Sequence, residues 1–496
     1  MPELAVETAA GPIRGTDDGA VRVWKGIPYA TARRWRAPEP AAPWSEQRDC
    51  TAFGPVCPQP ANRGIVFAAN TRQDEDCLSL NVWASPTIQP GDARPVVVWV
   101  HGGGFALGAG SQPHFHGGAF AGGGEIVLVT LNYRLGAFGF LDLSSAGVGD
   151  TNLALRDVLL ALEWVRDSIA AFGGDPQNVT LAGHSAGAGL VTALLATPAS
   201  AGLFARAISQ SGPATSVYPA DHAARVADAL QRELGVDAAQ LPSVDADALV
   251  AASRRLFLQI PTVQPGTLAF APTVDDDILH EHPITAMAAG RAHPVPLILG
   301  STRDETALMR FSDESVLVPS TRDQVRVMLA AMETAVPGRG LPNEPQTATA
   351  YAGIRREASR REAVACDLAF RMPCVWVAEA HSAHAPVHLY RFDWAPRFTR
   401  LTRGAGHSSE LRYLWGEIEH YPRDPTFKLG GLRTSRAVSR RFRGRWHDYA
   451  ATGDPGWPAY DRASRQSLVA DSEDRVAVDL DARPRAAWGA VPLTFC

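Results

Sequence analysis

The chain has 496 residues, of which 46% are hydrophobic and 20% charged, and its formal net charge is −5 at pH 7. This composition is typical of a globular protein with a large core, and the charge balance argues against a nucleic-acid partner. Six cysteines in a chain of this length exclude a disulfide framework, and no C-x-x-C pair is present for zinc. Positive charge is almost all arginine, a bias typical of GC-rich coding.

The N-terminal residues, MPELAVETAAGPIRG, contain no basic segment followed by an apolar run, so we expect no signal peptide. The most apolar stretches, such as PVVVWV, are much too short to span a bilayer. We therefore expect a cytoplasmic monomer with no membrane or nucleic-acid partner.

Short β-branched runs alternate with helical patterns over roughly the first 300 residues, which favours an α/β layered fold. RPVVVWV at 94–100 and EIVLVTLNY at 125–133 are apolar on both faces and predict buried strands. NVTLAG at 178–183 predicts another strand, and the composition from Ala186 onward is helical. The segment 152–172 predicts a helix, because these apolar residues recur at helical spacing: Leu155, Leu159, Leu162, Val165 and Ile169.

The strand predicted at 94–100 runs directly into HGGGF at 101–105. Three consecutive glycines allow backbone N–H groups to turn toward a ligand without a Cβ in the way. A flexible loop would have the same composition, and a phosphate-binding loop would need a Lys-Ser/Thr pair that is missing here. In esterases, an HGGG loop upstream of a reactive serine supplies the donors of an oxyanion hole.

The stretch VTLAGHSAGAG at 179–189 contains the pattern G-x-S-x-G, with Ser185 at its centre. A strand is predicted before it and a helix after it, which is the context of a nucleophile elbow. Gly183 and Gly187 would let the strand and the helix pass closely, and the N-terminus of the helix would favour the negative charge that develops in acyl transfer. The sequence therefore predicts that Ser185 is a nucleophile.

A serine nucleophile needs a base, and the base needs an orienting acid. VPLILGSTRDE at 295–305 predicts a strand that ends in two adjacent carboxylates, Asp304 and Glu305, and the residues alone do not choose between them. His407 stands in the glycine-bracketed loop RGAGHSSE, a pattern that also fits an ordinary surface histidine. The candidate bases after the acid region are His381, His384, His388, His407, His420 and His447.

Together these stretches resemble the type-B carboxylesterases, the α/β-hydrolase family that includes bacterial p-nitrobenzyl esterases and the cholinesterases. The matching segments keep the family's order over nearly the whole chain: KGIPYA, FGPVCPQP, DEDCLSLNVW, HGGGFALGAG, NYRLGAFGFL, FGGDPQNVTLAGHSAGA, ISQSGPA, GSTRDETALM, GHSSELRYLWG and DYAATGDPGWPAY. The resemblance implies one α/β-hydrolase domain over residues 1–496, with a central mixed, mostly parallel sheet flanked by helices. It also implies helical insertions at roughly 310–385 that shape an active-site gorge.

The resemblance further implies hydrolysis of small to medium carboxylic esters, with no cofactor and no metal. The family's RDE motif assigns the acid to Glu305, and its H-x-x-E motif, matched by His407 and Glu410, assigns the base to His407. The same triad could cleave a carbamate, amide or thioester, whereas the presence of Ser185 argues against a non-catalytic binding protein. Backbone oxyanion donors and a supporting serine complete the implied site: Gly103, Gly104, Ala186 and Ser211.

The resemblance also implies two structural ion pairs, Arg34 with Glu75 and Arg134 with Asp175. The chain departs from the family at His184, where a glutamate usually precedes the nucleophile, which puts recognition of a cationic substrate in doubt.

Cys57 and Cys77 match a family pair that forms a disulfide in secreted members. Because we expect a reducing cytoplasm, we predict that the two thiols lie close together and are reduced. The motif HFH, with His114 and His116, lacks nearby carboxylates, so we expect solvated side chains there and no metal.

Overall fold

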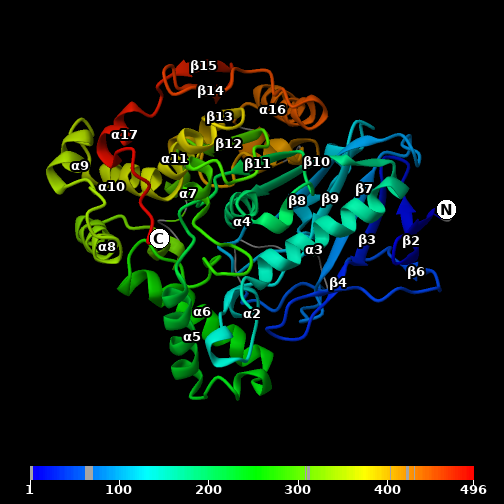
Figure 1. Cartoon of the computed structure of the whole chain (residues 1–496). Coiled ribbons are helices and arrows are strands. Elements are labelled where there is room, and N and C mark those ends of the chain that lie inside the picture. Colours follow the sequence, from blue (N-terminus) through cyan, green and yellow to red (C-terminus); the bar gives the residue numbers. More distant parts are fainter. Residues whose placement is uncertain are drawn as a thin grey trace.

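The computed structural model of the protein describes residues 4–61, 67, 71–307, 309, 313–402, 404–420, 424–428 and 430–496. A mixed β-sheet crosses the centre of the molecule (Figure 1). Two short strands, β4 (Ala30–Thr31) and β5 (Glu39–Pro40), pair outside it, and β6 (Arg48–Asp49) pairs with β2. The strand order is β1 (Leu4–Thr8), β2 (Gly11–Asp17), β3 (Arg22–Pro28), β7 (Ser79–Ala84), β9 (Val127–Leu131), β8 (Arg94–Val100), β10 (Gly174–His184), β11 (Arg206–Gln210), β12 (Leu297–Thr302), β13 (Val387–Phe392), β14 (Gln466–Ala470) and β15 (Arg475–Val478).

The middle of this sheet is parallel. Every neighbouring pair from β9 through β8 and β10 to β14 is parallel, whereas β1, β2, β3 and β7 join one edge antiparallel and β15 closes the other. Loops that follow parallel strands leave the sheet at the same edge, where open α/β sheets bind their ligands. The predicted mixed, mostly parallel sheet flanked by helices is confirmed.

The elements predicted from hydrophobic patterns are also present. The strand expected at 94–100 is β8, and the one expected at 125–133 is the shorter β9. The helix expected at 152–172 is α3 (Leu153–Ser168), followed by a 3-10 turn at Ile169–Phe172, and its predicted apolar stripe is buried. The helix expected from Ala186 onward is α4 (Ala186–Leu195).

Alternate residues of the central strands pack into two separate cores, because successive strand side chains point to opposite faces. On β8, Val96 and Val98 belong to one core together with α3, α4 and α11 (Met372–His381). Val97 and Trp99 belong to the other core, which α16 (Leu432–Thr452) covers with Phe442, Trp446 and other residues. Both faces of the central sheet are therefore buried and shielded from water, which explains the continuous apolar run in β8.

The remaining helices lie around the sheet, with α5 and α6 together at the bottom of Figure 1 and α8, α9 and α10 at its left. Part of the region predicted as gorge-forming insertions, residues 310–312, lies outside the described residues. Within the described ranges, no helix combines the length and apolar character needed to cross a bilayer. The bounds are α1 (Gly118–Ala121), α2 (Gly136–Phe140), α5 (Ala220–Leu234), α6 (Ala246–Val263), α7 (Pro283–Ala288), α8 (Arg322–Ala335), α9 (Glu344–Ala350), α10 (Glu357–Cys366), α12 (Arg397–Thr402), α13 (Leu411–Leu414), α14 (Glu417–His420), α15 (Pro425–Lys428) and α17 (Ala482–Trp488).

One of the two expected ion pairs is present. Arg34 donates from Nε to Oε2 of Glu75 over 2.8 Å, as predicted.

The predicted ion pair between Arg134 and Asp175 is wrong. Arg134 pairs with Asp157, which α3 holds fully buried, with 2.9 Å between Nε and Oδ2. Asp175 instead accepts a hydrogen bond from the N–H of Gln177 at the start of β10. The buried guanidinium takes the carboxylate that shares its dry environment, because an unpaired buried charge is costly.

Candidate active site

Ser185 stands at a sharp turn between β10 and α4. Its backbone has φ 55° and ψ −125°, a left-handed conformation that is rare for a residue with a side chain. A Cβ on Gly183 would lie 2.6 Å from the carbonyl carbon of Gly187, and one on Gly187 would lie 2.1 Å from the carbonyl oxygen of Val100. The two glycines of the motif therefore permit the close packing that holds the serine in its strained conformation.

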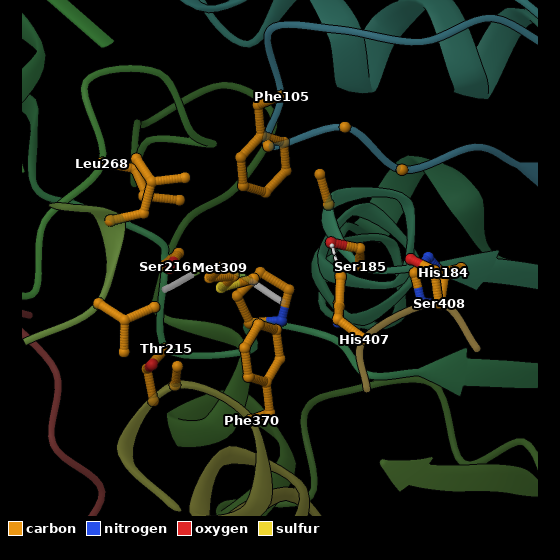
Figure 2. Close-up of a pocket in the computed structure, with 18 of the residues that line it drawn as sticks. Phe105, His184, Ser185, Thr215, Ser216, Leu268, Met309, Phe370, His407 and Ser408 are labelled. Carbon is orange, nitrogen blue, oxygen red and sulfur yellow. Dashed lines mark hydrogen bonds between the residues drawn. The ribbon is translucent and has the colours of Figure 1, made fainter. Parts of the chain in front are cut away.

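Three side chains that are far apart in the sequence meet at this turn. Nε2 of His407 lies 2.9 Å from Oγ of Ser185 (Figure 2), and Nδ1 of His407 lies 2.6 Å from Oε2 of Glu305. Glu305 follows β12, and His407 lies in a loop after β13, the neighbouring strand in the sheet. The structure thus brings together the serine, the histidine and the carboxylate that the sequence predicted.

The other oxygen of Glu305 is also fixed. Oε1 accepts a hydrogen bond from Oγ of Ser211 and one from the N–H of Thr302, both over 2.6 Å. Asp304 does not take this place, because its Oδ2 accepts from the N–H of Ala405 in the loop that carries the histidine. The two adjacent carboxylates therefore have different partners. Glu305 contacts the imidazole, and Asp304 connects its own loop to the loop that carries His407.

The glycine loop lies directly beside Ser185. Gly103 and Gly104 have φ values of 133° and 62°, and together with Ala186 they line the same pocket as the serine. In the described part of the chain, no group of the protein accepts a hydrogen bond from the N–H groups of Gly103 and Gly104. Two backbone donors next to the serine hydroxyl suit a developing oxyanion.

Comparison with known proteins shows the family of this chain. Residues 2–488 match the family model described as "Carboxylesterase family". The chain belongs to the carboxylesterase family. It is 38% identical to para-nitrobenzyl esterase of Bacillus subtilis (strain 168), with 98% of each chain covered, and 33% identical to phenmedipham hydrolase of Pseudarthrobacter oxydans, with 96% of this chain and 97% of the relative covered. A solved structure named as a thermophilic PNB esterase superimposes with a TM-score of 0.85 at 37% identity, covering 97% of this chain and 99% of that one.

The pocket of this carboxylesterase has a volume of about 480 Å³ and is lined mostly by apolar side chains. Among the described residues that line it, none is Asp, Glu, Lys or Arg. Figure 2 shows Ser185 and His407 across the pocket from Leu268. Helices α6 and α8 supply Phe257, Met328 and Met332, and residues 368–370, 493 and 495 also line the wall. Such a pocket suits an uncharged, largely apolar ligand.

Three buried histidines near the serine turn, His101, His114 and His184, have lowered pKa values. Burial lowers the pKa of His101 and of His114 to about 4. Burial, and then the neighbouring His407 and His114, hold the pKa of His184 well below its usual range. The ring of His184 packs 4.7 Å from that of His407. His184 is therefore neutral at pH 7, so the residue that departs from the family adds no charge to the site.

A second carboxyl group lies buried behind the site. Oε1 of Glu410 accepts from Nε2 of Gln210 and from the hydroxyl of Tyr390, over 2.8 and 2.9 Å. Burial, and then the charge of Glu305, raise the pKa of Glu410 to about 8. Glu410 is thus mostly protonated at pH 7.

The other candidate histidines have partners elsewhere. His381 and His388 bond to the carbonyls of Val295 and Trp457, and His447 bonds to Glu125. His384 packs beside Gly290, and the side chain of His420 lies outside the described residues.

The HFH motif divides between two environments. The expectation of solvated side chains is wrong for His114, which is partly buried and lines the pocket, whereas His116 is exposed and packs edge-on against Trp83. Over the described ranges, no three His, Cys, Asp or Glu side chains form a group that could hold a metal ion.

Cys57 and Cys77 are buried beside each other, and all six cysteines are free thiols. A hydrogen bond from the Cys77 thiol to Cys57, together with burial, raises the pKa of Cys77 well above its ordinary value. The expected proximity is therefore present. Residues 62–66 and 68–70, between the two cysteines, lie outside the described residues.

Sequence reasoning missed most of the pocket wall. Phe370 packs against the ring of His407 with 4.8 Å between the ring centres, and no motif marked it. Gln210 lies inside the recognised ISQSG segment, so its place behind the site could have been suspected. The apolar residues of α6 and α8 carry no signal that separates a pocket wall from an ordinary core.

Proposed function

We propose that this carboxylesterase hydrolyses carboxylic esters of small to medium size through an acyl-enzyme on Ser185. The observation that carries the proposal is the 2.9 Å contact between Nε2 of His407 and Oγ of Ser185. An imidazole at this distance can remove the hydroxyl proton as the oxygen attacks. Glu305, with 2.6 Å between its Oε2 and Nδ1 of His407, orients the base and stabilises the imidazolium that forms.

The reaction proceeds in two steps. In the first step, Oγ of Ser185 bonds to the ester carbonyl carbon and its proton passes to Nε2 of His407. The N–H groups of Gly103, Gly104 and Ala186 stabilise the negative oxygen, and His407 then protonates the departing alcohol. In the second step, water attacks the acyl-enzyme by the same route, so the acid is released and the proton returns to the serine.

The substrate class follows from the pocket wall. Its described residues bear no charged side chain, so both the acyl and the alcohol portions of the preferred ester are uncharged. A p-nitrophenyl ester series of graded chain length tests this, alongside a carbamate, an anilide and a thioester. We expect the neutral esters to have the highest kcat/KM, and a preference for any of the other three bonds would redefine the reaction.

The assignment of the nucleophile has a direct test. Ser185→Ala fills the same turn without an oxygen, so the variant should fold with an unchanged circular dichroism spectrum. It should also lose covalent labelling by a fluorophosphonate probe and ester hydrolysis above background. Labelling equal to that of the unchanged protein would remove Ser185 from the mechanism.

We also propose that the whole chain acts as one catalytic domain, as a monomer in a bacterial cytoplasm, with the helices at roughly 310–385 shaping the gorge. The GC-rich coding bias and the bacterial origin of the two relatives named above support this. Light scattering with size exclusion gives the mass in solution. Alkylation at the moment of cell lysis, followed by peptide mass spectrometry, should find Cys57 and Cys77 as free thiols, and a predominantly linked peptide pair would refute the cytoplasmic assignment.

A further inference from the structure

The helix that leads from α10 into α11 is interrupted beside the pocket. Residues Asp367–Arg371 form a π-helical turn between Cys366 and Met372. Pro373 lacks the N–H that a regular α-helix would direct to the carbonyl of Ala369, and its ring would clash with that carbonyl. The helix therefore widens at this point, a distortion that occurs most often at functional sites.

One side of this π-turn forms a wall of the site. Leu368, Ala369 and Phe370 line the pocket. The ring of Phe370 lies against the imidazole of His407, with 4.8 Å between the ring centres and 37° between the planes. Figure 2 shows this side chain rising from the turn into the pocket. The turn thus limits where the imidazole can move.

The ends of the π-turn point away from the pocket into a buried ionic cluster. Asp367 is fully buried and Arg371 is nearly so, and Nη1 of Arg371 lies 3.1 Å from Oδ1 of Asp367. The hydroxyl of Tyr351 donates to Oδ2 of Asp367 over 2.6 Å, and it accepts from Nε1 of Trp488 over 2.7 Å. Buried charges that are paired and hydrogen-bonded in this way hold a fixed geometry.

Arg371 makes a second hydrogen bond, to the turn that carries Glu305. Its Nη2 donates to the carbonyl of Arg303 over 2.9 Å. Arg303 begins the turn that carries Glu305, two residues further on. A planar guanidinium with separate donors can bind a carboxylate and a carbonyl at the same time. One side chain therefore connects the π-turn, which carries Phe370, to the loop that carries the acid.

We propose that Arg371 is a positioning residue that fixes the distance between Glu305 and His407. The π-turn restrains the imidazole of His407 through Phe370. Arg371 binds the turn that carries Glu305 to the same π-turn, so Glu305 and His407 are both held by one element. A misplacement of about 1 Å in such a pair costs on the order of 100-fold in rate. This inference rests on the proposed ester hydrolysis and adds a residue that touches no reacting atom.

The test is Arg371→Lys. Lysine keeps a positive charge next to Asp367, but its single ammonium cannot also hold the Arg303 carbonyl in the same plane. We expect kcat to fall by about tenfold and KM to change by less than about twofold. The downfield proton resonance of the Glu305–His407 hydrogen bond should shift or broaden, a signature that a purely structural role would not affect.

A matched control exists in the same chain. Arg134 is also a buried arginine that pairs with an aspartate, Asp157, and donates to a main-chain carbonyl, that of Arg36 over 2.7 Å. Arg134→Lys should lower the stability by a similar amount and leave both kcat and the downfield resonance unchanged. Equal losses of kcat in the two variants would show that Arg371 acts only through stability and would overturn the proposal.

A second variant and a labelling control complete the design. If Arg371→Lys does not fold, Arg371→Met combined with Asp367→Asn removes both charges together, and the same loss of kcat is expected. An unchanged kcat in a folded variant, or a loss confined to KM, would refute the positioning role. Fluorophosphonate labelling of the unchanged protein is measured in parallel, because its absence would mean that the proposed function, rather than the role of Arg371, has failed.

Discussion

The serine side and the acid–base side of the site are built in different ways. The serine turn uses a short continuous segment, 183–187, and its shape comes from backbone conformation and from glycines that a larger residue would disrupt. Glu305 and His407 are 102 positions apart and are brought together by neighbouring parallel strands and by side-chain hydrogen bonds. The first half is encoded locally, whereas the second depends on the assembled sheet.

This difference predicts how each half fails. A larger residue at either glycine of the serine turn moves the backbone, so it should cost stability as well as activity. A change on the acid–base side removes a single hydrogen bond, so it should cost activity while the fold persists.

The largest effect is expected for Glu305→Gln. The amide cannot stabilise the imidazolium as the carboxylate does, so kcat should fall by about 10⁴-fold with little change in the midpoint of thermal unfolding. Asp304→Asn is the control, because its amide oxygen can still accept from the N–H of Ala405. Steady-state kinetics of both variants check the ranking, and the reverse order would assign the acid to Asp304.

The next effect concerns stability. In Gly187→Ala the new Cβ would lie 2.1 Å from the carbonyl oxygen of Val100, which is backbone and cannot rotate away. The free energy of unfolding should fall by about 3 kcal/mol or more. In Gly189→Ala the nearest atom is the edge of the Phe105 ring at 3.1 Å, so the loss should be much smaller. Urea unfolding of the two variants measures the difference, and similar losses would mean that the turn tolerates substitution.

The third effect depends on pH. The pKa of Glu410 is about 8 in the folded protein against an ordinary 4.5, so the folded state binds the extra proton between these values. The contribution of Glu410 to the free energy of unfolding should therefore decrease as the pH rises from 5 to 8. Glu410→Gln imitates the protonated form, so its stability should match that of the unchanged protein near pH 5 and exceed it by a few kcal/mol at pH 8. Urea unfolding at both pH values checks the sign, and parallel curves for the two proteins would contradict it.

The difference between locally encoded elements and contacts between distant elements also explains what the sequence could predict. The strand β8, the helix α3 and the turn at Ser185 were all foreseeable, because their signals are periodicity and glycine spacing within short segments. The choice of Glu305 over Asp304 came only from the family resemblance, since both carboxylates follow the same strand. The structure shows that Oε2 of Glu305 meets the imidazole while Asp304 joins two loops.

The errors and omissions share one cause. Asp175 was expected to pair with Arg134, but the partner is Asp157 on α3, and nothing in the linear spacing separates the two. Phe370 and Arg371 were missed because their importance comes from a π-turn that Pro373 imposes in a helix of ordinary composition. Such contacts are decided when distant elements pack together, and a single sequence carries no local sign of them.

The parallel order of β10, β11, β12 and β13 has a consequence for the kinetics of folding. Parallel neighbours are joined by long connections, so the entropy of closing large loops must be lost before their contacts form. Ser185 and His407 are 222 positions apart, and their meeting requires all four of these strands to be in register. During refolding, helical signal should therefore return before hydrolytic activity, and the lag between the two measures how long the chain spends with its nucleophile formed but without its base.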